Sequence, residues 1–389
     1  MKALVVEALW EPREGYLPAE KETLLRRASM GSQVWKNPVF EIKDVSVPDI
    51  GVNEVLVRVK RCGICGSDTH IYENDMDGYI LFSGPARFPC IIGHEYSGVV
   101  EKVGKNVDTL RHGDIVAAES IHWCGKCTPC RSGAFNQCQK VELIGITKDG
   151  ALAEFICAKE RHCWKIDSLR ERLSEDDVFS LGALIEPIGC AYNGIFISGG
   201  GFKPGITVVV YGVGPIGLAA VALSRLAGAS LILAFDTIDE RLSIAKSMGA
   251  DLVYNINELK NTVIQPRDIV MERTKGVGAE LQVESAGAAP FTVPEMENSL
   301  AVNGKIIYLG RAAASVPLML DTLVSGANSI IGARGHAGYG IYNNIIRLIA
   351  SGRLNVKEMI TSTYEFKDAI GAIKNSTTRT DGKSLVFVS

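Results

Sequence analysis

The chain has 389 residues, more than one ordinary hydrophobic core accommodates, so its length predicts two domains. Apolar residues make up 47% of the sequence and charged residues 22%, proportions that are typical of a soluble globular protein. The net charge of -3 gives no electrostatic reason to expect nucleic acid or a membrane surface as a partner.

The N-terminus and the apolar runs favour a cytoplasmic protein. Lys2 and Glu7 place charges inside the first apolar stretch, which therefore does not have the pattern of a signal peptide. No apolar run in the sequence reaches the ~18 residues that a membrane span needs. All ten cysteines lie between Cys62 and Cys190, and in a cytosolic chain such clustering favours metal ligands or catalytic groups over disulfides.

The first part of the chain has the pattern of short strands. Residues 54–60 alternate apolar and polar side chains with a period of two, as a half-buried strand does. Residues 98–116 have further strand patterns separated by glycine turns. Between Trp10 and Pro38 lies a polar, charged stretch with a helical pattern at residues 20–27, which we interpret as an insertion. We therefore expect an irregular β-rich first domain.

The second part of the chain alternates apolar, β-branched runs with helical patterns. Strands are expected at residues 208–211, 231–235, 252–254, 280–283, 305–309 and 329–332. Helices are expected at residues 215–227, 239–248, 268–274 and 290–300. This alternation predicts βαβ units and a parallel sheet. A helix at residues 342–350 and a strand at residues 384–388 are expected to pack on the first domain.

One cluster of cysteines has the spacing of a closed metal site. The four residues, separated by two, two and seven others, are Cys124, Cys127, Cys130 and Cys138. Four thiolates can surround a tetrahedral zinc ion and leave no position for a substrate, so the pattern predicts a structural zinc. The alternatives are four free cysteines in a loop and a redox-active C-x-x-C pair.

A glycine-rich turn lies between a predicted strand and a predicted helix. Its candidate cofactor-binding residues are Gly212, Gly214, Pro215, Ile216 and Gly217. In this context the turn and the helix N-terminus can bind a pyrophosphate. Asp236 ends the next predicted strand, where an acid binds ribose hydroxyls and repels a 2′-phosphate, so we expect NAD rather than NADP. Arg241 nearby is a further candidate contact to the coenzyme, and its charge leaves NADP as an alternative to NAD. The alternative to a coenzyme site is a tight turn that only serves packing, with a solvated Asp236.

A third group of residues has the ligand types of an open zinc site. It consists of Cys65, His94, Glu95 and Glu186. Any one of these residues is more often structural, but they occur in one chain with a closed cysteine site and a dinucleotide-binding pattern.

These motifs resemble the zinc-dependent medium-chain dehydrogenase/reductase family, which contains the alcohol and polyol dehydrogenases. The resemblance rests on residues 93–98 followed by Gly104 and Val107, on residues 62–68, on the four-cysteine lobe and on residues 149–155. It implies a GroES-like catalytic domain at residues 1–193 and 341–389, with the structural zinc lobe at residues 119–140. It also implies a Rossmann NAD-binding domain, a doubly wound parallel sheet, at residues 194–340, and a homodimer or homotetramer.

The resemblance implies the ligands of a catalytic zinc. Cys65 and His94 would bind the metal, and Glu186 would be the third ligand. Glu95 matches an acid of the family that approaches or supports the metal. Cys190, four residues after Glu186, is the alternative third ligand. Two zinc ions per chain are therefore expected, one catalytic and one structural.

The resemblance also implies a path for the proton. Ser67 matches the hydroxyl that bonds the substrate oxygen, and His70 matches the last group of the relay to solvent. Asp68 would orient His94 from outside the ligand set. Cys62 is expected to pack in the core.

The pair Glu186-Pro187 resembles the polyol, sugar and threonine dehydrogenases. Ile121 stands where the threonine enzymes have histidine, and residues 31–35, 77–81, 191–193 and 335–338 are similar to bacterial enzymes that oxidise inositol-derived ketones. The resemblance therefore implies oxidation of a polyol or cyclitol of the scyllo-inosose type. The alternatives are an L-threonine 3-dehydrogenase, an acyclic sorbitol- or xylitol-type dehydrogenase, and a nucleotide-binding protein without catalysis.

The contacts to the substrate are the least specified part of the site. We expect three residues to hydrogen bond the substrate hydroxyls, namely Glu119, Tyr79 and His336. The alternative is that these three are surface or interface residues.

Overall fold

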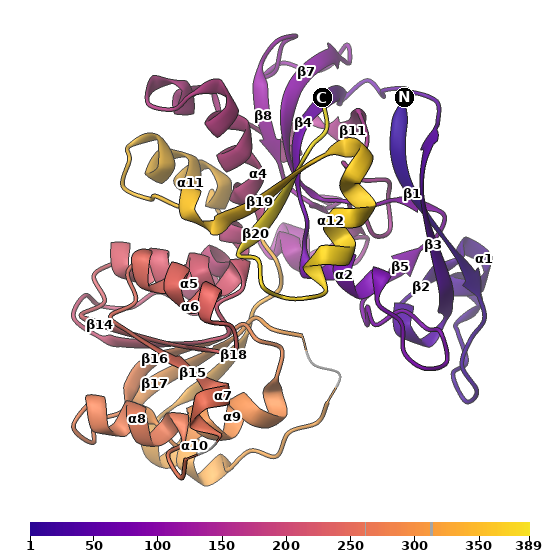
Figure 1. Cartoon of the computed structure of the whole chain (residues 1–389). Coiled ribbons are helices and arrows are strands. Elements are labelled where there is room, and N and C mark those ends of the chain that lie inside the picture. The colour runs from indigo at the N-terminus through magenta and orange to yellow at the C-terminus, as the bar shows by residue number, and fades with distance from the viewer. Residues whose placement is uncertain (261, 312–313) are drawn as a thin grey trace. The chain divides into compact units, whose positions relative to one another are not determined.

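In the computed structural model, which describes residues 1–260, 262–311 and 314–389, the second part of the chain builds a six-stranded parallel sheet (Figure 1). The strands are β13 (Thr207–Tyr211), β14 (Leu231–Asp236), β15 (Leu252–Asn255), β16 (Ala279–Glu284), β17 (Leu300–Tyr308) and β18 (Ser329–Gly332). Their order in the sheet is β15-β14-β13-β16-β17-β18, which is the doubly wound order of the Rossmann fold. The predicted α/β fold class is confirmed.

Helices accompany this sheet because its strands are apolar on both faces. Val208, Val209 and Val210 of β13 are all buried, as expected for a strand covered on both sides. The helices are α5 (Pro215–Leu226), α6 (Asp239–Ser247), α7 (Ile256–Leu259), α8 (Pro266–Arg273), α9 (Ala289–Glu297) and α10 (Leu320–Gly326). Aromatic rings of neighbouring strands stack in the core. The ring centre of Phe235 lies 5.1 Å from that of Tyr211 and 5.3 Å from that of Tyr254.

The boundary between α9 and β17 differs from the predicted one. The helix was expected to reach residue 300, but it ends at Glu297, and β17 begins at Leu300. Leu300 already pairs with Ala279 of β16, and the register shifts before the ladder resumes at Lys305. Leu300 thus fits a helical pattern but pairs with a strand of the sheet, and local periodicity cannot predict such a tertiary contact.

A second sheet, largely antiparallel, combines strands of the first part of the chain with two C-terminal strands. Its strands are β4 (Glu54–Gly63), β7 (Glu95–Val103), β8 (Ile115–Ala118), β11 (Phe155–Lys159), β12 (Cys163–Lys165), β19 (Ile360–Glu365) and β20 (Lys383–Phe387). The C-terminal strand β20 pairs with β4, with Leu385 opposite Gly63, as the predicted return of the chain requires.

Smaller sheets complete this part. One has three strands, in the order β3 (Trp35–Asp44), β1 (Lys2–Trp10) and β6 (Cys90–Ile91). Two others are strand pairs, formed by β2 (Arg27–Ala28) with β5 (Ala86–Arg87) and by β9 (Ile121–His122) with β10 (Glu142–Leu143). The helices outside the parallel sheet are α1 (Glu20–Leu25), α2 (Gly66–Tyr72), α3 (Thr128–Arg131), α4 (Glu175–Tyr192), α11 (Ile341–Ala350) and α12 (Ala369–Ser376).

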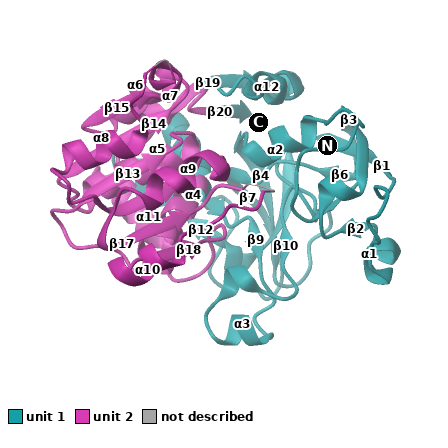
Figure 2. Ribbon diagram, turned by 90° about the horizontal axis from the view of Figure 1, so that it is seen from below, with its two compact units in different colours: residues 1–186, 362–379, 384–389 teal, residues 187–361, 380–383 magenta. Residues whose placement is uncertain are grey.

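The chain divides into two units (Figure 2). Unit 1 comprises residues 1–186, 362–379 and 384–389, and unit 2 comprises residues 187–361 and 380–383. The predicted domain limits were 193 and 341. All candidate zinc ligands from Cys65 to Glu186 lie in unit 1, and the glycine-rich turn lies in unit 2.

One helical stretch is long and apolar enough to cross a membrane by length and composition alone. It is Glu175–Ser198, which joins α4 to a π-helical turn. Its apolar window is 78% buried inside the protein, as expected for a core helix.

Candidate functional site

Strand pairing brings two separate loops together in unit 1. β4 and β7 are antiparallel, and their register places Gly63 opposite Glu95. The chain leaves β4 at Gly63 and places Cys65 at the N-terminus of α2. One donor atom from each of Cys65, His94 and Glu95 lies within 4.8 Å of the other two. Three of the predicted ligands are therefore in one place.

Two glycines permit this close approach. A Cβ atom at Gly63 would lie 2.2 Å from a carboxylate oxygen of Glu95, so a larger residue would displace that side chain. Gly93 has a φ of +86°, and a Cβ atom there would meet Cγ of Leu152 at 2.7 Å. The turn at Gly93 lets His94 and Glu95 enter the core, where they are 5% and 1% exposed.

The charges around His94 favour a bound cation. Burial alone would lower the pKa of His94, because it penalises the imidazolium form. Interactions with Cys65, followed by the charges of Asp68 and Glu186, outweigh burial and raise this pKa well above its ordinary value. The Nδ1 atom of His94 is buried and has no hydrogen-bond partner among the described residues. A sulfur, an imidazole with an unsatisfied nitrogen, and carboxylates form a donor set that fits zinc.

Glu186 reaches this region from α4. Its side chain is buried, and its Oε1 atom accepts a hydrogen bond of 2.7 Å from Oγ of Ser120. The charge of Glu186 contributes to the raised pKa of His94. However, the carboxylate whose oxygen lies within 4.8 Å of both Cys65 and His94 is that of Glu95. The structure thus brings both carboxylates to the site, and Glu186 as the third ligand stays a prediction.

Ser120 is a candidate that the sequence motifs did not reveal. We expect Ser120→Ala to weaken zinc binding at the catalytic site roughly 10- to 100-fold, because such losses follow removal of a hydrogen-bond partner of a ligand. Competition with a chromogenic chelator measures this affinity. Ser120→Thr keeps the hydroxyl and should restore binding. Equal zinc affinity in Ser120→Ala and in the wild type would show that this hydrogen bond does not hold Glu186 for the metal.

Ser67 and His70 lie one turn apart on α2. The Oγ atom of Ser67 is buried and lacks a hydrogen-bond partner within the described part of the chain. The side chain of His70 is 47% exposed, and its Nδ1 atom lies 3.2 Å from Oε2 of Glu73. Glu73 also accepts a hydrogen bond of 2.6 Å from Arg379. A buried hydroxyl and a solvent-exposed imidazole three residues apart can form the two ends of a proton path.

The pH dependence of alcohol oxidation tests this path. Partial burial and the charge of Arg379 lower the pKa of His70, although Glu73 opposes them. The neutral imidazole, which can accept a proton, therefore persists to lower pH than usual. In Arg379→Gln this pKa should rise, so the acid limb of the kcat profile should move to higher pH. His70→Ala should slow oxidation most at low pH, and profiles identical to wild type in both variants would remove His70 from the path.

The predicted structural site forms one cluster of sulfur atoms. All four donors lie within 4.8 Å of one another, and Sγ of Cys127 is 3.4 Å from that of Cys130 and 3.8 Å from that of Cys138. All four cysteines are free thiols. Hydrogen bonds from the backbone of Lys126 and Cys127 lower the pKa of Cys124 to about 6, which favours the thiolate that zinc binds. Burial raises the pKa of Cys130 to about 12, so metal binding there must release a proton.

The glycine-rich turn joins β13 to α5 in unit 2. Gly212 has a φ of +82°, and a Cβ atom there would lie 2.6 Å from the backbone of Ala286. A Cβ atom at Gly217 would lie 1.9 Å from the carbonyl oxygen of Gly212. Gly214 caps the 12-residue helix α5, which begins at Pro215. The bare backbone and the helix N-terminus have the form of a pyrophosphate site.

Asp236 and Arg241 both lie beside this turn. Oδ2 of Asp236 accepts a hydrogen bond of 2.7 Å from the backbone of Val213, and Oδ1 accepts from two further backbone N–H groups. Nη1 of Arg241 would lie 3.6 Å from a Cβ atom at Gly214. The carboxylate favours ribose hydroxyls, whereas the guanidinium can pair with a 2′-phosphate.

Coenzyme choice should therefore depend on Asp236. We expect Asp236→Ser to shift the ratio of kcat/KM for NADP over that for NAD by about tenfold or more, because the repulsion of the 2′-phosphate is lost while Arg241 remains. Arg241→Gln is the control and should lower the use of NADP. An unchanged ratio in Asp236→Ser would mean that the carboxylate does not face the ribose.

The three predicted substrate contacts are all buried. Glu119 accepts a hydrogen bond of 3.0 Å from Nε1 of Trp164, and the guanidinium of Arg13 lies 3.9 Å from the ring centre of Tyr79. His336 belongs to unit 2. Glu119 and Tyr79 thus contact other protein side chains, and a role for the three residues toward substrate stays a prediction.

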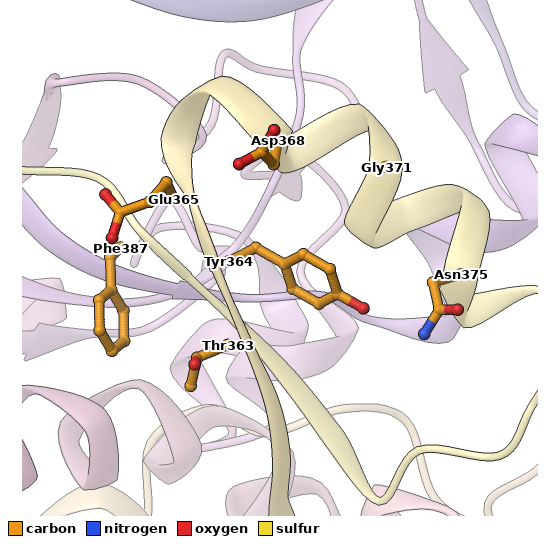
Figure 3. Close-up of a pocket in the computed structure, with 7 residues that line it drawn as sticks. All are labelled: Thr363, Tyr364, Glu365, Asp368, Gly371, Asn375 and Phe387. Carbon is orange, nitrogen blue, oxygen red and sulfur yellow. The ribbon is translucent and has the colours of Figure 1, made fainter.

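A pocket of about 520 Å³ on unit 1 contains none of the candidate ligands (Figure 3). Its lining residues come from β19, from α12 and the turn before it, and from the end of β20, and Figure 3 shows the carboxylates of Glu365 and Asp368 among them. Two carboxylates disfavour a negatively charged coenzyme, so the glycine-rich turn remains the candidate coenzyme site.

Comparisons with known proteins agree with both sites. The family description "Alcohol dehydrogenase GroES-like domain" matches residues 51–168, and "Zinc-binding dehydrogenase" matches residues 215–351. A Thermotoga maritima protein named scyllo-inosose 3-dehydrogenase is 35% identical over 100% of this chain and 99% of its own. The chain belongs to the zinc-binding alcohol dehydrogenases. The predicted family and the prediction of an enzyme are confirmed.

Further relatives of this zinc-binding alcohol dehydrogenase share its full length or most of it. A solved Thermotoga maritima structure of the alcohol dehydrogenase class has a TM-score of 0.94 and 33% identity, over 99% of both chains. An Escherichia coli alcohol dehydrogenase in complex with NADH has a TM-score of 0.79 and 26% identity, over 100% of this chain and 99% of its own. D-xylulose reductase A of Aspergillus niger is 32% identical over 85% of this chain and 88% of its own. Zinc and a nicotinamide dinucleotide are the cofactors of this dehydrogenase.

Proposed function

We propose that this dehydrogenase oxidises a secondary alcohol of a polyol or cyclitol to a ketone with NAD as the hydride acceptor, and that its substrate is an inositol-derived ring of the scyllo-inosose type. The observation that carries the proposal is the similarity to the Thermotoga maritima scyllo-inosose 3-dehydrogenase, which extends over the whole of this chain. The acyclic alternative is favoured less, because the fungal D-xylulose reductase matches 85% of the chain.

Cys65, His94 and Glu186 are the proposed ligands of the catalytic zinc, with Glu95 beside them. A bound zinc ion would supply Lewis-acid polarisation of the substrate hydroxyl. A thiolate and a carboxylate among the ligands balance the charge of the metal, and the carboxylate makes the site more polar. This polarity suits a substrate with several hydroxyl groups. A Glu186→Ala variant that retained two zinc ions per chain would assign the third position to Glu95.

The proton leaves by the residues of α2. The buried Oγ of Ser67 would take up the proton of the substrate hydroxyl, and His70 would pass it to solvent. Glu73 and Arg379 hold the imidazole at the surface end of this path.

A substrate screen tests the proposal. Steady-state rates with NAD should give the highest kcat/KM for inositol-type cyclitols, assayed beside sorbitol, xylitol and L-threonine. A higher value for threonine or for an acyclic polyol would replace the cyclitol assignment. Zinc content distinguishes an enzyme with two metal ions per chain from a nucleotide-binding protein with one.

We also propose a cytoplasmic homo-oligomer, either a dimer or a tetramer. All ten cysteines are free, which suits a reducing compartment. Sedimentation velocity of the full chain measures the oligomeric state, and a monomer at micromolar concentration would contradict it.

A further inference from the structure

A second pocket on unit 1 lies where the segment between β1 and β3 meets β5. Its volume is about 470 Å³, which is within the range of small-molecule sites. Leu25, Ala8 and Pro89 give it apolar walls, and Leu25 is 50% exposed. Arg26 and Arg87 also line it. None of these residues belongs to the candidate zinc site or to the coenzyme site.

The arginines of this Arg26/Arg87 pocket have no acidic partner. Throughout the described ranges, no carboxylate forms an ion pair with Arg26, with its neighbour Arg27 or with Arg87. Arg26 lies 5.9 Å from the ring centre of Trp10, a cation–π distance that positions the guanidinium without cancelling its charge. Arg27 donates a hydrogen bond to the carbonyl oxygen of Val141, which is also neutral.

Two acids of the same segment are engaged elsewhere, and the other two, Glu14 and Glu20, form no ion pair with the pocket arginines within the described ranges. Glu22 of α1 accepts hydrogen bonds from the backbone N–H groups of Ala19 and Ser29. Glu11 pairs with Lys36 at 2.7 Å, and the two aspartates that follow α2 pair with Arg13. None of these carboxylates therefore forms an ion pair with the arginines of the pocket.

The pairing of β2 with β5 increases this imbalance. Arg27 stands directly opposite Arg87 in the antiparallel register. Like charges opposite each other destabilise a strand pair, and two residues a strand give few hydrogen bonds to offset this. A bound anion would remove the repulsion.

We propose that the Arg26/Arg87 pocket binds a small organic anion, a phosphate or carboxylate that carries an apolar group. The guanidinium groups would bond the anion, since their N–H donors match carboxylate and phosphate oxygens. The walls of Leu25, Ala8 and Pro89 would take the apolar group. This assigns a ligand site to the insertion at residues 11–38, and it does not depend on the proposed substrate.

Titration calorimetry with phenyl phosphate tests the proposal on the full-length zinc-loaded enzyme at low ionic strength. NAD is kept at saturation so that the coenzyme site is occupied. We expect phenyl phosphate to bind with a Kd on the order of 1 mM or tighter, inorganic phosphate to bind more weakly, and anisole, which has neither an anionic group nor a hydroxyl, not to bind. Arg26→Gln/Arg87→Gln should weaken phenyl phosphate at least tenfold with dehydrogenase activity unchanged.

Two further variants make the result decisive. Arg111→Gln/Arg353→Gln removes the same charge from two other exposed arginines and should leave the affinity unchanged. Leu25→Glu keeps both pocket arginines but gives them a carboxylate, and it should abolish binding. Equal affinity of the wild type and the Arg26→Gln/Arg87→Gln variant would overturn the site. Inorganic phosphate binding as tightly as phenyl phosphate would overturn the role of the apolar walls.

Discussion

Replacement of Cys65 by alanine is expected to abolish oxidation of the alcohol while the chain stays folded and binds NAD. Cys65 supplies the sulfur of the donor group that also contains His94 and Glu95, which lies in unit 1, whereas the coenzyme turn lies in unit 2. The loss in kcat should exceed the ~10- to 100-fold that removal of a ligand's outer hydrogen-bond partner costs. Steady-state kinetics and zinc content measure the effect, and zinc should fall from two ions per chain to one.

Cys62 provides the matched control. It lies three residues before Cys65 and is fully buried in the core of unit 1. Cys62→Ala should cost roughly 0.5–3 kcal/mol of stability, as core truncations do, and keep both zinc ions and full turnover. Full turnover in Cys65→Ala, or equal loss of zinc in both variants, would contradict the assignment of Cys65 as a ligand.

The parallel sheet could be predicted from the sequence because its strands are buried on both faces. Such strands appear as unbroken apolar runs, so the expected strand at residues 231–235 is β14 (Leu231–Asp236) and the expected helix at residues 215–227 is α5 (Pro215–Leu226). The pattern failed where the sheet itself decides the conformation, as at Leu300, whose partner is 21 residues earlier in the chain.

The short strands of unit 1 could not be predicted. β2, β5, β6, β9 and β10 have two residues each, and such pairs have no readable periodicity. They exist because residues far apart in the chain meet, as Arg27 meets Arg87. The Arg26/Arg87 pocket depends on these pairings, so the sequence gives its arginines but not their common position.

The candidate zinc site shows the same limit. Motif resemblance named Cys65, His94, Glu95 and Glu186 by residue type, and the structure adds which donors lie within 4.8 Å. Ser120 was missed because its hydrogen bond to Glu186 spans 66 residues and no spacing rule connects the two. Glu119, predicted as a substrate contact, accepts a hydrogen bond from Trp164, and its role toward substrate stays a prediction.

Replacement of Cys127 by alanine is expected to impair stability rather than the chemical step. Between residues 123 and 140 the buried side chains are Cys130, Asn136 and Cys138, so the lobe has almost no apolar core. Its helix α3 has four residues, too few to be stable alone. Binding of a structural zinc contributes about 10–16 kcal/mol in small zinc domains, so loss of a thiolate should unfold the lobe. We expect a lower Tm and one zinc ion per chain.

Cys157 is the control for this variant, because it is a partly exposed cysteine of unit 1 outside both donor groups. Cys157→Ala should keep two zinc ions, although it loses the hydrogen bond from its thiol to Glu54. Cys127→Ala and Cys65→Ala should each lose one zinc ion per chain, but they should differ in Tm, in thiol reactivity and in turnover. The former should lower Tm and expose the remaining lobe thiols to a thiol reagent, whereas the latter should keep Tm and lose turnover. A Cys127→Ala protein with wild-type Tm and unreactive lobe thiols would show that zinc does not hold the lobe together.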